Sequence, residues 1–136
     1  MPADPQRVRF FVDETSLGLG KALAIARDDV VHTGHPLVPE IPLGAPDTDW
    51  IPAVAARNLA VISRDRHVRT RPGERLLLEQ HGLQVFWIAG RHDMRTWETL
   101  VLLVRRWDDI EETLATRGPG PWFMAVNQMG LTEIAL

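Results

Sequence analysis

The sequence predicts an α/β fold in which a mainly parallel sheet is covered by helices on both faces. Apolar runs with strand character alternate along the chain with segments of helical periodicity. Most of the strand runs are apolar at nearly every position, which is typical of parallel strands buried on both faces. The expected strands lie at residues 7–12, 30–33, 59–63, 84–88, 122–127 and 131–136. The last two, turning at Met129-Gly130, are expected to form a hairpin or an antiparallel edge.

Helices are expected between these strands, at residues 15–27, 47–57, 72–81 and from 93 or 96 to about 114. Thr15 or Ser16 is expected to cap the first helix, and Asp47 or Asp49 the second. Residues 34–46 contain six Gly or Pro in thirteen positions, so this segment is expected to be a loop. The apolar stripe from Trp97 to Leu114 is expected to face the core, with Trp87, Trp97 and Trp107 packed internally.

Composition indicates one globular domain spanning residues 1–136. The chain is 45% hydrophobic and 24% charged, close to the average for globular proteins. The absence of cysteine excludes disulfides, thiolate catalysis and cysteine-ligated metals. No apolar run reaches membrane-spanning length, and the first residues lack a secretion signal, so a cytoplasmic location is expected. A net charge of −3 argues against nonspecific nucleic-acid binding through overall charge.

Acidic residues follow two of the expected strands. Asp13 comes directly after the first strand and Asp65 follows the third, two residues past Ser63, while Asp47 and Asp49 open the helix that leads into the third. Parallel strands end at one edge of the sheet, where ligands bind in open α/β folds. Carboxylates gathered there would repel each other unless a cation such as Mg²⁺ or Mn²⁺ lay between them. The alternative is that each Asp only caps a helix or forms a turn.

Basic residues follow the third expected strand. Arg64 and Arg66 flank Asp65 and are the candidates for contact with a phosphate group. They can instead pair with Asp65 as a structural arrangement. The five histidines show no ligand spacing, which argues against zinc.

With these residues in view, the chain resembles the PIN domain superfamily, and most of all the compact VapC-type toxins of toxin–antitoxin systems. The resemblance covers roughly residues 8–90. The matching segments are Phe10-Phe11-Val12-Asp13-Glu14, Asp47-Thr48-Asp49-Trp50-Ile51, Ala60-Val61-Ile62-Ser63-Arg64-Asp65-Arg66 and Gly82-Leu83-Gln84-Val85-Phe86. The resemblance implies a three-layer PIN-like sandwich, to which residues 91–136 add a helix and a hairpin.

The resemblance also implies a metal-dependent ribonuclease. Asp13, Asp47 and Asp65 would bind Mg²⁺ or Mn²⁺, with Asp49 as the competing choice for Asp47 and Glu14 as a further carboxylate. Larger PIN domains carry an additional acid where Arg66 and His67 stand here, so the resemblance is compatible with either one or two metal ions. The implied partners are an RNA substrate and an antitoxin protein. A homodimer also remains open, as do the RNA target and the role of residues 91–136.

Other acidic-edge folds fit the sequence poorly. A receiver domain needs a lysine at a later strand end, and Lys21 is the only lysine. A haloacid dehalogenase-type phosphatase needs a second Asp where Thr15 stands, and no phosphate-binding loop motif is present. The alternative from another class is a catalytically silent PIN-like module that binds RNA or protein.

Overall fold

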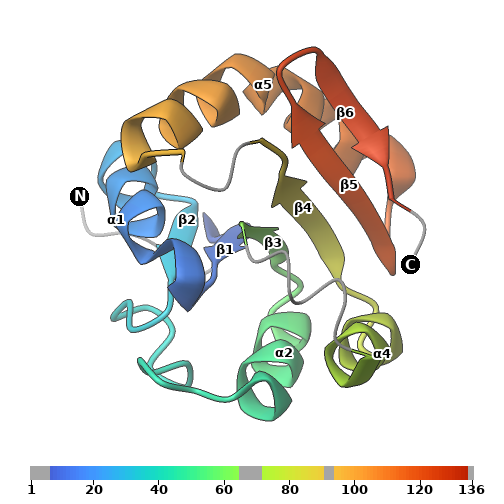
Figure 1. Ribbon diagram of the computed structural model, residues 1–136. Helices are drawn as coiled ribbons and strands as arrows, with labels where there is room; N and C mark the ends of the chain where they lie inside the picture. Colours follow the sequence, from blue (N-terminus) through green and yellow to red (C-terminus); the bar gives the residue numbers. More distant parts are fainter. Residues whose placement is uncertain (1–6, 65–71, 91–93, 135–136) are drawn as a thin grey trace.

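The middle layer of the protein is a six-stranded sheet with the order β2-β1-β3-β4-β5-β6 (Figure 1). The structure is a computed structural model that describes residues 7–64, 72–90 and 94–134. Strands β1 to β5 are all parallel, and β6 pairs antiparallel with β5. The strands are β1 (Phe10–Val12), β2 (Val30–His32), β3 (Ala60–Ser63), β4 (Gln84–Ile88), β5 (Trp122–Asn127) and β6 (Gly130–Glu133).

Helices cover both faces of the sheet, which confirms the predicted α/β fold. Helices α1 (Leu17–Ala26) and α5 (Thr96–Arg117) lie on one face, and α2 (Asp47–Ala56) and α4 (Pro72–Gln80) on the other (Figure 1). A short 3₁₀ helix, η2 (Glu14–Ser16), joins β1 to α1. None of the helices in the described part of the chain has the length and apolar character needed to cross a membrane.

The alternation of side chains along β1 explains the two core layers. Phe11 packs with Trp50 and Ile51 of α2 in one cluster, while Phe10 and Val12 pack with residues of α1 and α5 in the other. All three residues of β1 have exposed fractions of 0%. Successive strand side chains point to opposite faces, so a strand buried on both faces must be apolar throughout.

The predicted cap of the first helix is confirmed as a position only, and the predicted cap of the second is wrong. Ser16 occupies the N-cap of α1, but its side chain makes no capping bond. Pro46, not Asp47 or Asp49, is the N-cap of α2, and Asp47 is the first helical residue. The acidic side chains still lie in the first turn of α2, where they complement the positive end of the helix dipole.

Trp97 is not part of the core, contrary to the prediction. Its side chain is 71% exposed and that of Val104 is 65% exposed, whereas Leu102, Leu103 and Ile110 of the same helix are buried. Trp97 and Val104 are seven positions apart and therefore share one face of the helix. Each residue turns the helix by about 100°, so the face of Val104 is rotated by about that angle from the buried Leu103. The helix is apolar on more than one side, so the spacing alone did not identify the packed side. Trp87 is buried and Trp107 is half-buried.

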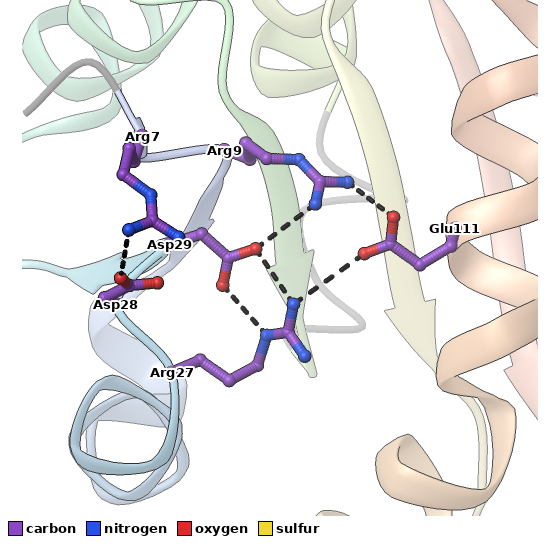
Figure 2. Close-up of polar contacts among 6 residues, drawn as sticks. All are labelled: Arg7, Arg9, Arg27, Asp28, Asp29 and Glu111. Carbon is purple, nitrogen blue, oxygen red and sulfur yellow. Dashed lines mark hydrogen bonds and ion pairs between the residues drawn. The ribbon is translucent and has the colours of Figure 1, made fainter.

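A cluster of ion pairs joins α1, β1, β2 and α5 at the end of the sheet where the parallel strands begin (Figure 2). The buried Asp29 accepts two hydrogen bonds from Arg27, of 2.8 and 3.0 Å, and one of 3.2 Å from Arg9. Arg9 also donates to Glu111 of α5 at 2.6 Å. Arg27 lies over the ring of Trp107, 4.6 Å from its centroid. These contacts fix α5 against the start of β1.

The same contacts shift the pKa of Asp29. Burial raises the pKa of this carboxyl group, but the hydrogen bonds and charge of Arg27, followed by the charge of Arg9, outweigh it and hold the pKa below its usual value. A lowered pKa stabilises the folded state above the unfolded-state value, near 3.8, and this contribution is lost as pH falls through the folded-state pKa.

We predict that Asp29→Asn lowers the free energy of unfolding by about 2 kcal/mol at pH 7, because it removes the buried negative charge that pairs with both Arg27 and Arg9. Urea unfolding measures this change. The matched control is Asp28→Asn, which removes an exposed pair with Arg7 (Figure 2) and should cost less than about 1 kcal/mol. Equal effects of the two variants would show that the buried cluster contributes no more than a surface pair.

Candidate active site at the carboxyl edge of the sheet

Asp13 is a buried acidic residue at the edge where the parallel strands end. It follows β1 directly and its exposed fraction is 5%. Its carboxylate accepts a hydrogen bond of 2.9 Å from Ser63 Oγ, and Thr15 Oγ1 lies 2.9 and 3.0 Å from its two oxygens. A buried carboxylate needs such donors to offset its desolvation. The two hydroxyls therefore hold the carboxylate of Asp13 in a fixed orientation.

Strand register explains why Ser63 reaches Asp13. Val12 pairs with Ile62 in the β1–β3 ladder, so the next residue of each strand comes to the same level. Asp13 N–H also donates to the Ile62 carbonyl at 3.4 Å. Ser63 was not predicted from the sequence as a donor to Asp13. Counting the two residues from the ends of their apolar runs would have placed them side by side.

Arg64 links the end of β3 to the starts of α1 and α5. Its backbone N–H donates to Ser16 Oγ at 3.2 Å, which explains why the Ser16 hydroxyl does not cap α1. Its guanidinium donates to the Met94 carbonyl at 2.7 Å. Within the described ranges, no carboxylate forms an ion pair with Arg64. A neutral acceptor therefore holds the guanidinium of Arg64 in place. The predicted contact of Arg64 with a phosphate group stays a prediction.

The loop before α2 is tied to the 3₁₀ helix after β1. Both oxygens of the exposed Glu14 carboxylate accept from Gly44 N–H, at 2.9 and 3.2 Å. The turn at Gly44 has a φ of 82°, which favours glycine. This contact brings the segment that leads into Asp47 to the edge where Asp13 lies. Glu14 thereby has a structural partner, which the sequence did not predict.

Asp47 and Asp49 differ in their surroundings. Asp47 is half-buried and its Oδ1 accepts the indole N–H of Trp50 at 2.7 Å. Trp50 in turn stacks on Phe11 with 5.6 Å between ring centroids, so the orientation of Asp47 is coupled to the core. Asp49 is exposed.

The predicted metal ligands are only partly described. Asp65 and the second predicted phosphate contact, Arg66, lie outside the described residues. Among the residues that are described, no three His, Asp or Glu side chains lie close enough to hold a metal ion. Asp13, Asp47 and Asp49 therefore do not form a metal centre by themselves. The further predicted ligand, Asp65, is outside that set, so the prediction of Mg²⁺ or Mn²⁺ stays a prediction.

Two histidines lie at the same edge: His32 is the last residue of β2, and His35 follows in the loop. The rings of His32 and His35 meet edge to face with 5.1 Å between centroids. His32 Nδ1 lies 2.8 Å from the Thr33 carbonyl, so this nitrogen carries the proton. His35 Nδ1 accepts from Leu37 N–H at 3.0 Å, so this nitrogen carries none. Burial, together with the charge of His32, lowers the pKa of His35.

Residues 8–90 match the model of the PIN-like domain family, and the chain therefore belongs to that family. This stretch holds β1 to β4, with Asp13, Asp47 and Ser63, and covers more than half of the chain. No curated protein and no solved structure matches the chain. Family membership confirms the PIN-like resemblance, whereas the closer resemblance to VapC-type toxins stays a prediction.

We predict that protonation of His35 destabilises the loop that leads into α2, because a protonated Nδ1 cannot accept from Leu37 N–H. The folded-state pKa lies below the ordinary value of about 6.5, so this contribution is full above that pH and falls as pH drops through it. Urea unfolding at pH 7.5 and 5.5 should show a smaller acid-induced loss for His35→Gln than for the wild type. The control is His81→Gln, which changes an exposed histidine and should lose as much stability in acid as the wild type. An acid-induced loss of stability in His81→Gln equal to that in His35→Gln would contradict the prediction.

Proposed function

We propose that the protein is a metal-dependent endoribonuclease whose active site is built around Asp13. The observation that carries the proposal is the buried carboxylate of Asp13, fixed by the Ser63 and Thr15 hydroxyls at the carboxyl edge of a PIN-like sheet. Burying a carboxylate at a strand end is costly, and core packing does not need it. A role in binding a cation explains why an Asp stands there.

In this proposal Asp13, Asp65 and either Asp47 or Asp49 provide the ligands for Mg²⁺ or Mn²⁺. Their carboxylate oxygens are the donors that hard divalent cations prefer. When bound, such an ion supplies an activated water and positive charge at the phosphodiester. Ser63 and Thr15 act as positioning residues because they orient the Asp13 carboxylate. Arg64 and Arg66 bind phosphate groups of the RNA strand.

We predict that Asp13→Asn lowers cleavage of a mixed RNA pool in Mn²⁺ or Mg²⁺ at least about a hundredfold, because an amide oxygen is a neutral and weaker ligand. The variant should fold, since the Asn oxygen still accepts from the Ser63 hydroxyl. Asp28→Asn, at the opposite end of the sheet, is the matched control and should cleave like the wild type. Wild-type activity in Asp13→Asn would exclude Asp13 from catalysis.

The same assay identifies the second acidic ligand. Asp47→Asn and Asp49→Asn change neighbouring acids of one helix, of which only the first is half-buried. The variant that loses activity marks the ligand. If the wild type neither cleaves RNA nor binds Mn²⁺ by calorimetry, the protein is instead a catalytically silent PIN-like module that binds RNA or protein.

We further propose that this nuclease is the toxin of a toxin–antitoxin pair, neutralised by an antitoxin protein. Controlled expression in bacterial cells should arrest growth with the wild type and not with Asp13→Asn at equal protein levels. Unchanged growth with a wild-type protein that cleaves RNA in vitro would overturn the toxin role and leave the ribonuclease standing.

A further inference from the structure

A small cavity of about 90 Å³ lies beside the Asp13 site, between the starts of α1 and α5. A water molecule occupies about 30 Å³ in the liquid, so this space is small and suits a compact group. Its walls are formed by residues of η2, α1 and α5 together with Arg64. The polar side chains among them are those of Thr15, Ser16, Arg64, Thr96 and Thr99.

The charge of the cavity comes from Arg64. Elsewhere in the protein, Arg9, Arg27, Arg57 and Arg117 each form an ion pair with a carboxylate. Arg64 differs, because its described partner is the carbonyl oxygen of Met94. A guanidinium has five N–H donors, and this bond uses one of them. Arg64 therefore presents a positive charge and further donors to the cavity.

Ser16 adds a second donor. Its exposed fraction is 6%, and its Oγ already accepts from Arg64 N–H. Within the described part of the chain no acceptor takes the proton of this hydroxyl. A buried hydroxyl proton without an acceptor is costly, and an oxyanion in the cavity would accept it.

The start of α5 forms another wall. Thr96 is the first residue of this 22-residue helix, and no side chain caps it. The first N–H groups of a helix have no acceptor within it and attract anions. A Cβ atom built on Gly18 would lie 3.5 Å from Thr96 Oγ1, so α1 and α5 meet closely at this point.

We propose that this cavity binds one phosphate group of the RNA strand, adjacent to the phosphate that is cleaved at the Asp13 site. That the bound strand is RNA rests on the proposed ribonuclease function. The donors that line the cavity are a guanidinium, a buried hydroxyl and helix N–H groups, and donors of these kinds recognise phosphate. Ser63, the last residue of β3, donates to Asp13, and the next residue, Arg64, donates to Ser16 in the wall of the cavity. The cavity and the acidic site therefore meet at the end of β3.

The test is RNA binding without cleavage. Fluorescence anisotropy of a labelled 12-nucleotide single-stranded RNA of mixed sequence is measured in EDTA over a range of salt concentrations. We expect Arg64→Gln to weaken binding about tenfold and to reduce the salt-dependence slope by about 0.7, the value for one phosphate contact to a single strand. Arg105→Gln, which removes an exposed arginine of α5, should change neither quantity.

Arg64→Lys separates charge from scaffolding. The lysine keeps a positive charge, so it should retain the salt slope while losing part of the affinity. Equal slopes for Arg64→Gln and Arg105→Gln would overturn the proposal. So would equal losses in Arg64→Gln and Arg64→Lys, or no binding of this RNA by the wild type at low salt.

Failure of this proposal is distinguishable from failure of the nuclease. Cleavage that depends on Asp13 while Arg64→Gln binds RNA normally would remove the phosphate cavity and leave the ribonuclease. Binding that depends on Arg64 without any metal-dependent cleavage would leave the cavity and remove the ribonuclease.

Discussion

The parallel pairing of β1 between β2 and β3 is the constraint on which the rest of the structure depends. A strand paired on both sides and covered on both faces must be apolar at every position, as Phe10, Phe11 and Val12 are. Parallel neighbours need crossover connections, which here are α1 and α2 with their loops. The same directionality brings Asp13, His32 and Ser63 to one edge of the sheet. The candidate site therefore follows from the pairing that builds the core.

The two ends of the parallel strands are stabilised by different chemistry. Where the strands begin, Asp29 is buried among charged partners, Arg27 and Arg9, and this cluster fixes α5 (Figure 2). Where they end, the described donors to Asp13 are hydroxyl groups, and the partner of Arg64 is a carbonyl. The Met94 carbonyl orients the guanidinium of Arg64 without neutralising its positive charge, as a carboxylate would. An edge arranged in this way is suited to binding charged ligands, whereas the ion-pair cluster is suited to holding elements together.

The alternation of strands and helices, and the position of Asp13, could be predicted from the sequence because both follow from local patterns. Apolar runs mark the strands, and an acid after such a run must lie at a strand end. The partners of the acid could not be predicted in the same way. Ser63 reaches Asp13 through the register of two strands fifty residues apart in the chain, and Glu14 reaches Gly44 across a loop. Trp97 was wrongly placed in the core because α5 is apolar on more than one side.

Ser16 shows how one residue type serves different purposes in the same local sequence. A serine before a helix predicts a cap, since its hydroxyl normally accepts from an N–H of the first turn. Here the 3₁₀ turn of η2 precedes α1, and the hydroxyl of Ser16 instead accepts from Arg64 N–H. The local rule fails where a tertiary contact competes for the same oxygen. That contact also attaches the segment leading from β3 toward Asp65 to the start of α1. The departure from the capping rule therefore falls where the acidic site and the phosphate cavity meet, which is where a function would be expected to override local preference.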